Sequence, residues 1–419
     1  MPSAFNPFDQ KPPRFAATVL NWKQIYPRSY DKTETDPFTK TRVILMNGTE
    51  YEAVWFSHQF HRHCTNNDIR RVIARARREE QQQQKQIACL KPLDESILET
   101  TIGYEQLAVD LTAAMAQTEP CECFVKALNF ALLEDFDHLY RYADLLEMEH
   151  GIRAEQLVGH YTEIMPGRPT IAEHRYAFDD VKPWLCFKKA EPLTKLHAMI
   201  ITAAEQQTMN YYMNQCQFYT SDPGRRLYQE IAMIEEQHVT QYGSFIDPDC
   251  TWLESNLMHE YVECYLYYSC LQDETHPGIK KVWEAHLEQE IGHLHDAAAL
   301  LEKYEGKCWQ QVIPDGNFPP LIKFQPNKDY IRKVLKETVT LTADREDYRE
   351  VSKMPGEADF FAWQDLVNKD VEAVPSHAVI ASYQAQSPSG EDYRYTDSPS
   401  PVKALQDRKT DNTDLGRRA

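Results

Sequence analysis

Four long helical patterns follow one another in the middle of this chain. They cover residues 193–219, 223–246, 251–272 and 277–305. In each pattern, apolar residues recur at the three- and four-residue intervals of one helix face. The short sequences SDPG, DPDC and THPG separate the patterns and are typical of helix breaks. Because short loops between long helices make antiparallel neighbours, the sequence predicts an up-and-down four-helix bundle.

Each of these patterns also carries an acidic side chain on the face that should be buried. The polar residues on the four apolar stripes are Glu205, Glu235, His238, Glu260, Glu263, Glu290 and His293. An unpaired buried carboxylate is costly, and these faces offer almost no Lys or Arg. A pair of divalent metal ions would neutralise the carboxylates, and the imidazoles would complete the coordination. Glu-x-x-His spacing puts both ligands one turn apart on one face, so we expect a dinuclear metal site.

The order Glu, Glu-x-x-His, Glu, Glu-x-x-His is the one found in ferritin-like di-iron carboxylate proteins. Residues 195–300 resemble the ferritin-like superfamily, and its rubrerythrin branch most. AEQQTMNYY resembles the first ligand helix of that branch, YQEIAMIEEQH the second and EQEIGH the fourth. The pair Glu260-x-x-Glu263 is similar to the double carboxylate of the third.

The resemblance implies a role for each of the seven residues. Glu205 would be a terminal ligand, Glu235 and Glu290 would bridge the metals, His238 and His293 would cap one metal each, and Glu260 and Glu263 would fill the remaining sites. The cofactors would be two Fe ions, or alternatively two Mn ions. One departure concerns the rubredoxin-like module of that branch, which needs paired Cys-x-x-Cys motifs. The ten cysteines form no such pair, which argues against a self-contained peroxide reductase.

Two further acidic–histidine pairs lie upstream. Glu147-x-x-His150 falls at a helix end beside Gly151, and we interpret it as a chance match. The stretch 131–146, ALLEDFDHLYRYADLL, contains Asp135, His138 and Tyr142. Their spacing is the same as that of Glu235, His238 and Tyr242. This stretch is either a degenerate half-repeat or another metal-binding helix, and the favoured interpretation is a helix with a partly exposed acidic turn.

The predicted fold is mainly all-α, a ferritin-like antiparallel four-helix bundle with extra helices and an irregular N-terminal region. The expected regions are 1–100 (a short hairpin at 41–56 and a charged helix at 67–90), 101–192 (helical extension and linker), 193–305 (the di-metal bundle), 306–375 (loop and helices) and 376–419 (a mobile polar tail).

The net charge of −19 argues against nucleic acid or an anionic membrane as a partner. No apolar run of 18 residues is present, which argues against a membrane span. The start of the sequence has no secretory-signal pattern, and its cysteines are scattered. Both features favour a cytoplasmic location.

The expected function is a non-haem di-metal oxidoreductase that activates O2 or peroxide, with an unidentified small-molecule substrate. An oxygenase would need an external electron donor. The alternatives are a di-manganese catalase-like site, Fe(II) oxidation with metal storage, and, least favoured, a metal-free helical interaction protein. Tyr212, Tyr242 and Tyr267 are candidate hydrogen-bond donors behind the ligands. We also expect a homo-oligomer such as a dimer.

Overall fold

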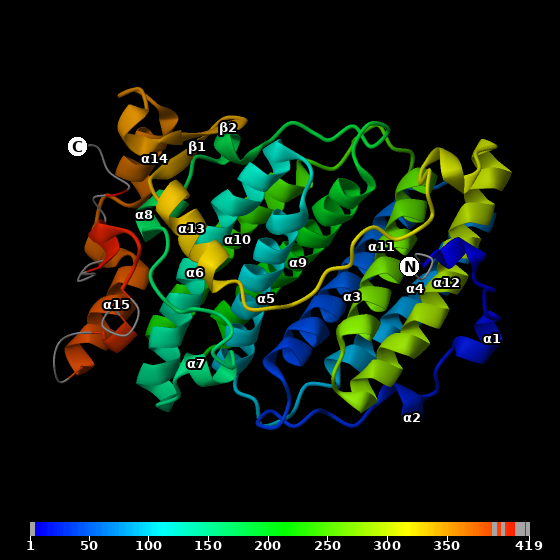
Figure 1. The fold of residues 1–419 in the computed structure, drawn as a ribbon, viewed down its shortest axis with the longest axis horizontal. Helices are drawn as coiled ribbons and strands as arrows, with labels where there is room; N and C mark the ends of the chain where they lie inside the picture. The colour runs from blue at the N-terminus through cyan, green and yellow to red at the C-terminus, as the bar shows by residue number, and fades with distance from the viewer. Residues whose placement is uncertain (1–4, 388–391, 395–398, 407–414, 416–419) are drawn as a thin grey trace. The chain divides into compact units, whose positions relative to one another are not determined.

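The computed structural model describes residues 5–387, 392–394, 399–406 and 415. The described chain is mainly helical, with one short β-hairpin, β1 (Leu341–Asp344) and β2 (Asp347–Glu350). It divides into two compact units, each made of discontinuous segments. Unit 1 comprises residues 1–95, 184–204 and 246–324, and unit 2 comprises 96–183, 205–245 and 325–419. Figure 1 follows the chain through both.

Unit 1 has a four-helix core built from two helical hairpins. The first hairpin is α3 (Pro37–His63) with α4 (Asn67–Ala88), and the second is α11 (Trp252–Asp273) with α12 (Pro277–Glu305). Helix α11 packs against α3, and α12 packs against α4. The shorter elements of this unit, which lie mostly on α4 and α12, are η1 (Pro7–Asp9), α1 (Phe15–Thr18), α2 (Trp22–Ile25) and η3 (Trp309–Gln311).

Unit 2 is built around α5 (Ile97–Thr118), α6 (Glu122–His150) and α10 (Asp222–Gly243). Helix α9 (Pro192–Phe218) contributes its residues from Glu205 onward to this unit. Helix α15 (Pro375–Gln386) packs against α6 and α10. The remaining elements are α7 (Ala154–Leu157), α8 (Thr170–Glu173), η2 (Ala177–Asp180), α13 (Lys328–Thr338), η4 (Val351–Lys353), α14 (Asp359–Val367), η5 (Val371–Ala373) and η6 (Lys403–Leu405).

Local sequence sets the ends of the ligand-bearing helices. Ser96 and Thr251 begin α5 and α11 with reciprocal capping boxes, in which the side chain at the cap and a Glu three residues later satisfy free backbone N–H groups. Gly151 and Gly306 end α6 and α12 with φ angles of 66° and 67°. This left-handed conformation suits glycine and closes the last helical turn.

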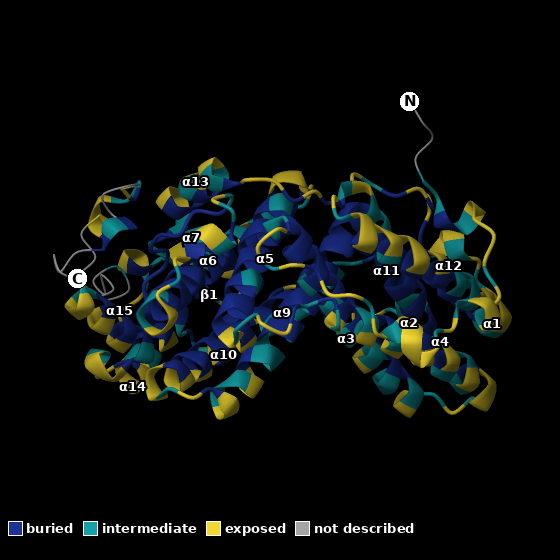
Figure 2. Cartoon of the chain, turned by 90° about the horizontal axis from the view of Figure 1, so that it is seen from below, coloured by how far each residue is buried: buried dark blue, intermediate teal, exposed yellow. Residues whose placement is uncertain are grey.

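Burial follows the core helices in both units, as the dark blue segments of Figure 2 show. Helix α6 is buried on nearly every side from Phe130 to Leu146. No helix among the described residues is long and apolar enough to cross a membrane.

The four helices expected over 193–305 form, with ends within a few residues of those predicted. These four helices are divided between the two units and do not form the single bundle expected from them. Helices α11 and α12 belong to unit 1, whereas α10 and residues 205–218 of α9 belong to unit 2. The limits of the two units do not coincide with the expected boundaries at 100, 192 and 305. Periodicity identifies the buried face of a helix, whereas tertiary packing selects the helix that covers it.

Two local predictions are also wrong. Residues 41–56 lie inside α3 and not in a hairpin, because the Asp36 cap and burial of the helix outweigh the Asn47-Gly48 turn signal. The expected polar tail begins with α15, whose Val379 and Ile380 are buried. Residues 388–391, 395–398, 407–414 and 416–419 of that tail lie outside the described residues.

Substitution of Gly167 tests the packing of the buried segment that follows α7. A Cβ atom at this position would lie 2.5 Å from the backbone oxygen of Leu133, which cannot move aside cheaply. We expect Gly167→Ala to lower the free energy of unfolding by about 1–3 kcal/mol. Chemical denaturation measures this change. The control is Gly356→Ala, whose Cβ meets nothing within 4 Å. Equal stability of the two variants would contradict the packing described.

Candidate metal centres

Unit 2 contains a buried cluster of four carboxylates and two imidazoles, here called the unit 2 cluster. Its members are Glu105 of α5, Asp135 and His138 of α6, Glu205 of α9, and Glu235 and His238 of α10. All six side chains are at most 1% exposed. Their ligand atoms form two groups, each within 4.8 Å, and Glu235 belongs to both. Two adjacent groups that share one carboxylate are what a dinuclear site with a bridging ligand requires.

The two imidazoles turn the same ring nitrogen toward this cluster. His138 Nδ1 lies 3.1 Å from one oxygen of Glu235, and His238 Nδ1 lies 3.2 Å from the other. His238 Nδ1 is also 3.2 Å from Asp135 Oδ1. Glu235 thus lies between two inward-facing nitrogen donors.

The opposite ring nitrogens meet buried carboxylates outside the cluster. His238 Nε2 lies 2.7 Å from Glu134 Oε2, and His138 Nε2 lies 3.5 Å from Glu173 Oε2. A carboxylate that accepts from Nε2–H fixes the tautomer with Nδ1 as the free donor atom, and this arrangement accompanies most metal-binding histidines. His238 therefore has the support that a metal ligand needs, and His138 Nε2 faces Glu173 at ion-pair distance without a hydrogen bond.

Buried arginines neutralise these supporting carboxylates. Arg141 binds both oxygens of Glu173, at 3.0 Å each, and also pairs with Asp137. Glu134 pairs with Arg175 and lies 3.4 Å from Arg168 Nε. The positive charge in this part of unit 2 is thus held by the outer carboxylates.

The inner carboxylates lack such compensation. Both oxygens of Asp135, both of Glu205 and one each of Glu105 and Glu235 are buried without a hydrogen-bond partner. Unsatisfied buried carboxylates are rare because each costs a desolvation penalty. Carboxylate oxygens and imidazole nitrogens are ligands of divalent metal ions, and the residues present therefore fit a pair of such ions.

The pKa values of the cluster residues also indicate that the cluster is stabilised by positive charge. Burial, with Asp135 next in importance, raises the pKa of Glu205 well above its usual value. Burial acts to lower the pKa of His238, but Asp135, Glu134 and Glu205 raise it well above the usual value. Burial acts to raise the pKa of Glu235, but hydrogen bonds from His138 and His238 bring it to about 2. Without a cation, the cluster favours protonated imidazoles beside Glu235.

Unit 1 contains a second buried group, here called the unit 1 cluster. Its members are Glu50 of α3, Glu80 of α4, Glu260 and Glu263 of α11, and Glu290 and His293 of α12. His293 Nδ1 lies 3.1 Å from Glu290 Oε2, and His293 Nε2 lies 3.2 Å from Glu79 Oε2. Within it, Glu260 belongs to two groups of close ligand atoms, one with Glu80 and His293 and one with Glu263 and Glu290.

The seven predicted ligands are therefore divided between two clusters. Glu205, Glu235 and His238 come together in unit 2. The other four, Glu260, Glu263, Glu290 and His293, come together in unit 1. Among the described residues, no group of close ligand atoms mixes the two sets.

The sequence interpretation missed Glu50, Glu80 and Glu105, and it considered Asp135 and His138 as a metal-binding helix without favouring that alternative. The partly exposed acidic turn assigned to Asp135 and His138 is wrong, since both side chains are fully buried. A regular spacing could have revealed them. The carboxylates pair at intervals of thirty residues, as Glu50 with Glu80, Glu105 with Asp135, Glu205 with Glu235, and Glu260 with Glu290.

Two of the three predicted tyrosines contact cluster carboxylates. Tyr212 Oη donates to Glu105 Oε1 at 2.5 Å, and Tyr267 Oη donates to Glu50 Oε1. The Tyr242 ring lies 6.5 Å from that of His238, and its hydroxyl has no hydrogen-bond partner.

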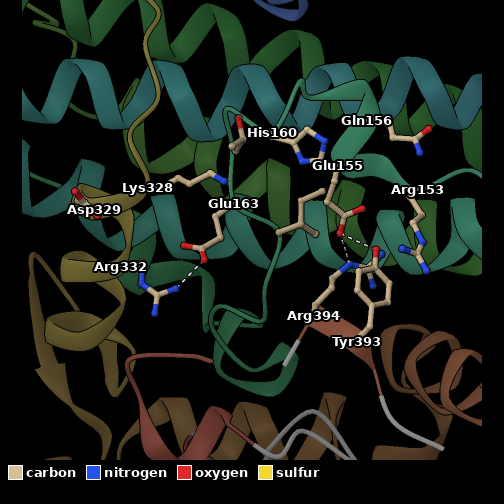
Figure 3. Close-up of a pocket in the computed structure, with 12 residues that line it drawn as sticks. Arg153, Glu155, Gln156, His160, Glu163, Lys328, Asp329, Arg332, Tyr393 and Arg394 are labelled. Atoms are coloured by element: carbon tan, nitrogen blue, oxygen red, sulfur yellow. Dashed lines mark hydrogen bonds and ion pairs between the residues drawn. The ribbon is translucent and has the colours of Figure 1, made fainter. Parts of the chain in front are cut away.

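A separate open cavity in unit 2 is lined by several cationic side chains (Figure 3). Its arginines are occupied by neighbouring carboxylates: Arg394 Nε donates to Glu155 at 2.9 Å, and Arg332 NH1 donates to Glu163 at 2.7 Å. This pairing leaves little uncompensated charge for an anionic ligand, and the buried clusters are the stronger candidates.

Substitution of Arg141 tests the buried ion pairs that hold Glu173 beside His138. Its replacement in Arg141→Leu would leave Asp137 and Glu173 buried without their cation, so we expect a loss of about 3–5 kcal/mol in the free energy of unfolding. Chemical denaturation of the metal-free protein measures it. The control is Arg226→Leu, because Arg226 pairs with Asp222 on the surface. That change should stay within about 0.5 kcal/mol. A comparably small effect at Arg141 would contradict the network.

Comparison of the chain with protein-family models, with curated proteins and with solved structures found no match.

Proposed function

We propose that the unit 2 cluster binds two iron ions and that the chain is a non-haem di-metal oxidoreductase acting on O2 or peroxide, with a ferritin-like arrangement of ligand helices. One observation carries the proposal: His138 and His238 direct Nδ1 at the two oxygens of Glu235, and each Nε2 faces a buried carboxylate. The order of ligands along α5, α6, α9 and α10 is Glu, Asp-x-x-His, Glu, Glu-x-x-His. This order supports the comparison with ferritin-like di-iron proteins.

The two groups of ligand atoms suggest how the residues share the metals. Asp135, Glu205 and His238 would hold one ion, and Glu105 and His138 would hold the other. Glu235 would serve both, since it belongs to both groups. The four carboxylates would balance the charge of two divalent ions.

The residues of the unit 2 cluster would hold two ferrous ions, and the chemistry that such a pair would supply is the two-electron reduction of O2 or peroxide. The chain's own residues prepare the site. The buried helices exclude bulk water, the pairs Glu134–Arg175 and Glu173–Arg141 orient the imidazoles, and Tyr212 donates to Glu105. The tyrosine hydroxyl is placed to hold a ligand carboxylate in one orientation.

Metal content tests the proposal. We expect His138→Ala and His238→Ala each to remove most of the iron, about two ions per chain, that the unit 2 cluster binds after anaerobic Fe(II) loading. Elemental analysis measures this loss. The control is His150→Ala, since His150 stands in an equivalent Glu-x-x-His spacing but is exposed at the end of α6. Equal loss in all three variants, or no loss in any, would contradict the assignment.

Oxygen measurements separate the chemical alternatives. We expect the Fe(II)-loaded protein to consume O2 or peroxide, and His238→Ala to lower the rate by at least about 100-fold because a metal ligand is lost. An oxygen electrode follows both reactions. Release of O2 from peroxide by a manganese-loaded protein would instead indicate catalase-like chemistry. A very large assembly that retains oxidised iron would indicate storage.

A further inference from the structure

The ligand-bearing helices of this chain form an internal repeat. Each helix of the first set begins and ends 155 residues before its counterpart: α3 before α9, α4 before α10, α5 before α11, and α6 before α12. The same interval relates Glu50 to Glu205, Glu80 to Glu235, Glu105 to Glu260, Asp135 to Glu290 and His138 to His293. Helix ends and carboxylate positions are thus repeated without insertion or deletion.

The two units combine these repeats crosswise. Unit 2 joins the second hairpin of the first repeat, α5 and α6, to α9 and α10 of the second repeat. Unit 1 joins α3 and α4 to α11 and α12. Each unit therefore contains one hairpin of each kind and a full set of ligand positions.

We propose that the unit 1 cluster is a second metal centre, with a more carboxylate-rich ligand set than the unit 2 cluster. Two positions distinguish it. Gln83 stands where the repeat has His238, and Glu263 stands where it has Ala108. Unit 1 therefore offers five carboxylates and one imidazole, against four carboxylates and two imidazoles in unit 2. Oxygen-rich sites favour Mn²⁺ relative to sites with more imidazole.

Buried oxygen atoms point to an occupant of this cluster. Glu50 Oε2, Glu80 Oε2, Glu260 Oε2 and both oxygens of Glu263 have no hydrogen-bond partner, and each of these residues is at most 3% exposed. The nearby groups that could compensate these charges are the imidazole of His293, the amide of Gln83, which donates to Glu290, and the imidazole of His259, whose Nε2 lies 3.7 Å from Glu263 Oε1. These three groups cannot compensate five carboxylates, whereas a pair of divalent cations can.

The supporting contacts of the unit 2 cluster recur here. Glu79, the residue before Glu80, accepts from His293 Nε2 across the core, as Glu134, the residue before Asp135, does from His238. Gln289 Nε2 also donates to Glu79, at 3.3 Å.

The tyrosine contact is repeated as well. Tyr267, seven residues after Glu260, donates to Glu50, as Tyr212, seven residues after Glu205, donates to Glu105. His286 Nδ1 lies 3.1 Å from the Tyr267 hydroxyl. The two units thus hold ligands with contacts of the same kind, made from positions that the 155-residue interval does not relate, since it pairs Tyr267 with Thr112 and Tyr212 with Ser57.

A narrow cavity reaches three ligands of the unit 1 cluster. It is lined by Glu80, Glu260 and His293, and also by Ala76 and Asp296. Asp296 is about 40% exposed and pairs with Arg75, so the cavity lies close to the protein surface.

Separate inactivation of the two clusters tests the second centre. We expect His293→Ala and the isosteric Glu263→Gln to reduce the total metal bound after anaerobic loading with Mn²⁺ or Fe²⁺ by about half, because two of about four ions lose a ligand. The control on the same helix is Glu288→Ala, an exposed residue that should leave the total unchanged. Elemental analysis gives the count, and circular dichroism verifies folding.

Several outcomes would overturn the second centre. Full metal content in both His293→Ala and Glu263→Gln would exclude it and leave the unit 2 proposal standing. Loss of all metal in His238→Ala, with no metal left to remove by His293→Ala, would also exclude it. Retention of half the metal in His238→Ala, removed only by the added His293→Ala, would support it.

Metal preference provides an independent test. With equal Mn²⁺ and Fe²⁺ supplied anaerobically, the centre left in His238→Ala should bind a several-fold higher ratio of Mn to Fe than the centre left in His293→Ala. Gln83→His should lower that ratio in the His238→Ala background by restoring the second imidazole. Equal ratios in all three proteins would contradict the inferred difference in ligand chemistry.

Discussion

The cost of burying negative charge governs this molecule. Each four-helix core encloses at least four carboxylates for which the described residues provide no arginine or lysine ion pair, and such groups destabilise a fold unless a positive charge lies among them. The buried Arg141 and Arg175 of unit 2 are paired with Glu173 and Glu134, which lie outside the cluster. The inner charge therefore needs compensation by protons or by metal ions. The raised proton affinity of Glu205 and of both unit 2 histidines expresses that need.

The carboxylates and arginines outside the unit 2 cluster explain how its imidazoles are held in one orientation. Arg141 and Arg175 hold Glu173 and Glu134, these carboxylates hold the Nε2 atoms, and the Nδ1 atoms remain directed inward. Part of this support comes from the segment after α7, which supplies Glu173 and Arg175 but no cluster ligand. The orientation of the cluster thus depends on residues far from it in the sequence.

Local features of the fold could be predicted from the sequence, and tertiary ones could not. The ends of α9 to α12 follow from caps, breakers and periodicity, and Gly151 and Gly306 mark helix ends as expected. Which two helical hairpins pack together depends on their tertiary contacts, and the sequence of one helix alone does not predict those contacts. Helix α6 shows the difficulty: it is buried almost all round, so Asp135 and His138 did not stand out from an apolar stripe. Asn47-Gly48 led to a wrong hairpin prediction, because this strong local turn signal lies within the buried helix α3.

We propose that two metal ions would share Glu235 as a ligand, and anomalous X-ray diffraction at the iron absorption edge can locate such ions. Crystals of the unmodified protein, loaded anaerobically with Fe(II), should show two anomalous peaks in unit 2, one within bonding distance of His138 Nδ1 and one within bonding distance of His238 Nδ1, with Glu235 contacting both. Fully loaded crystals with no peak among these residues would contradict the account.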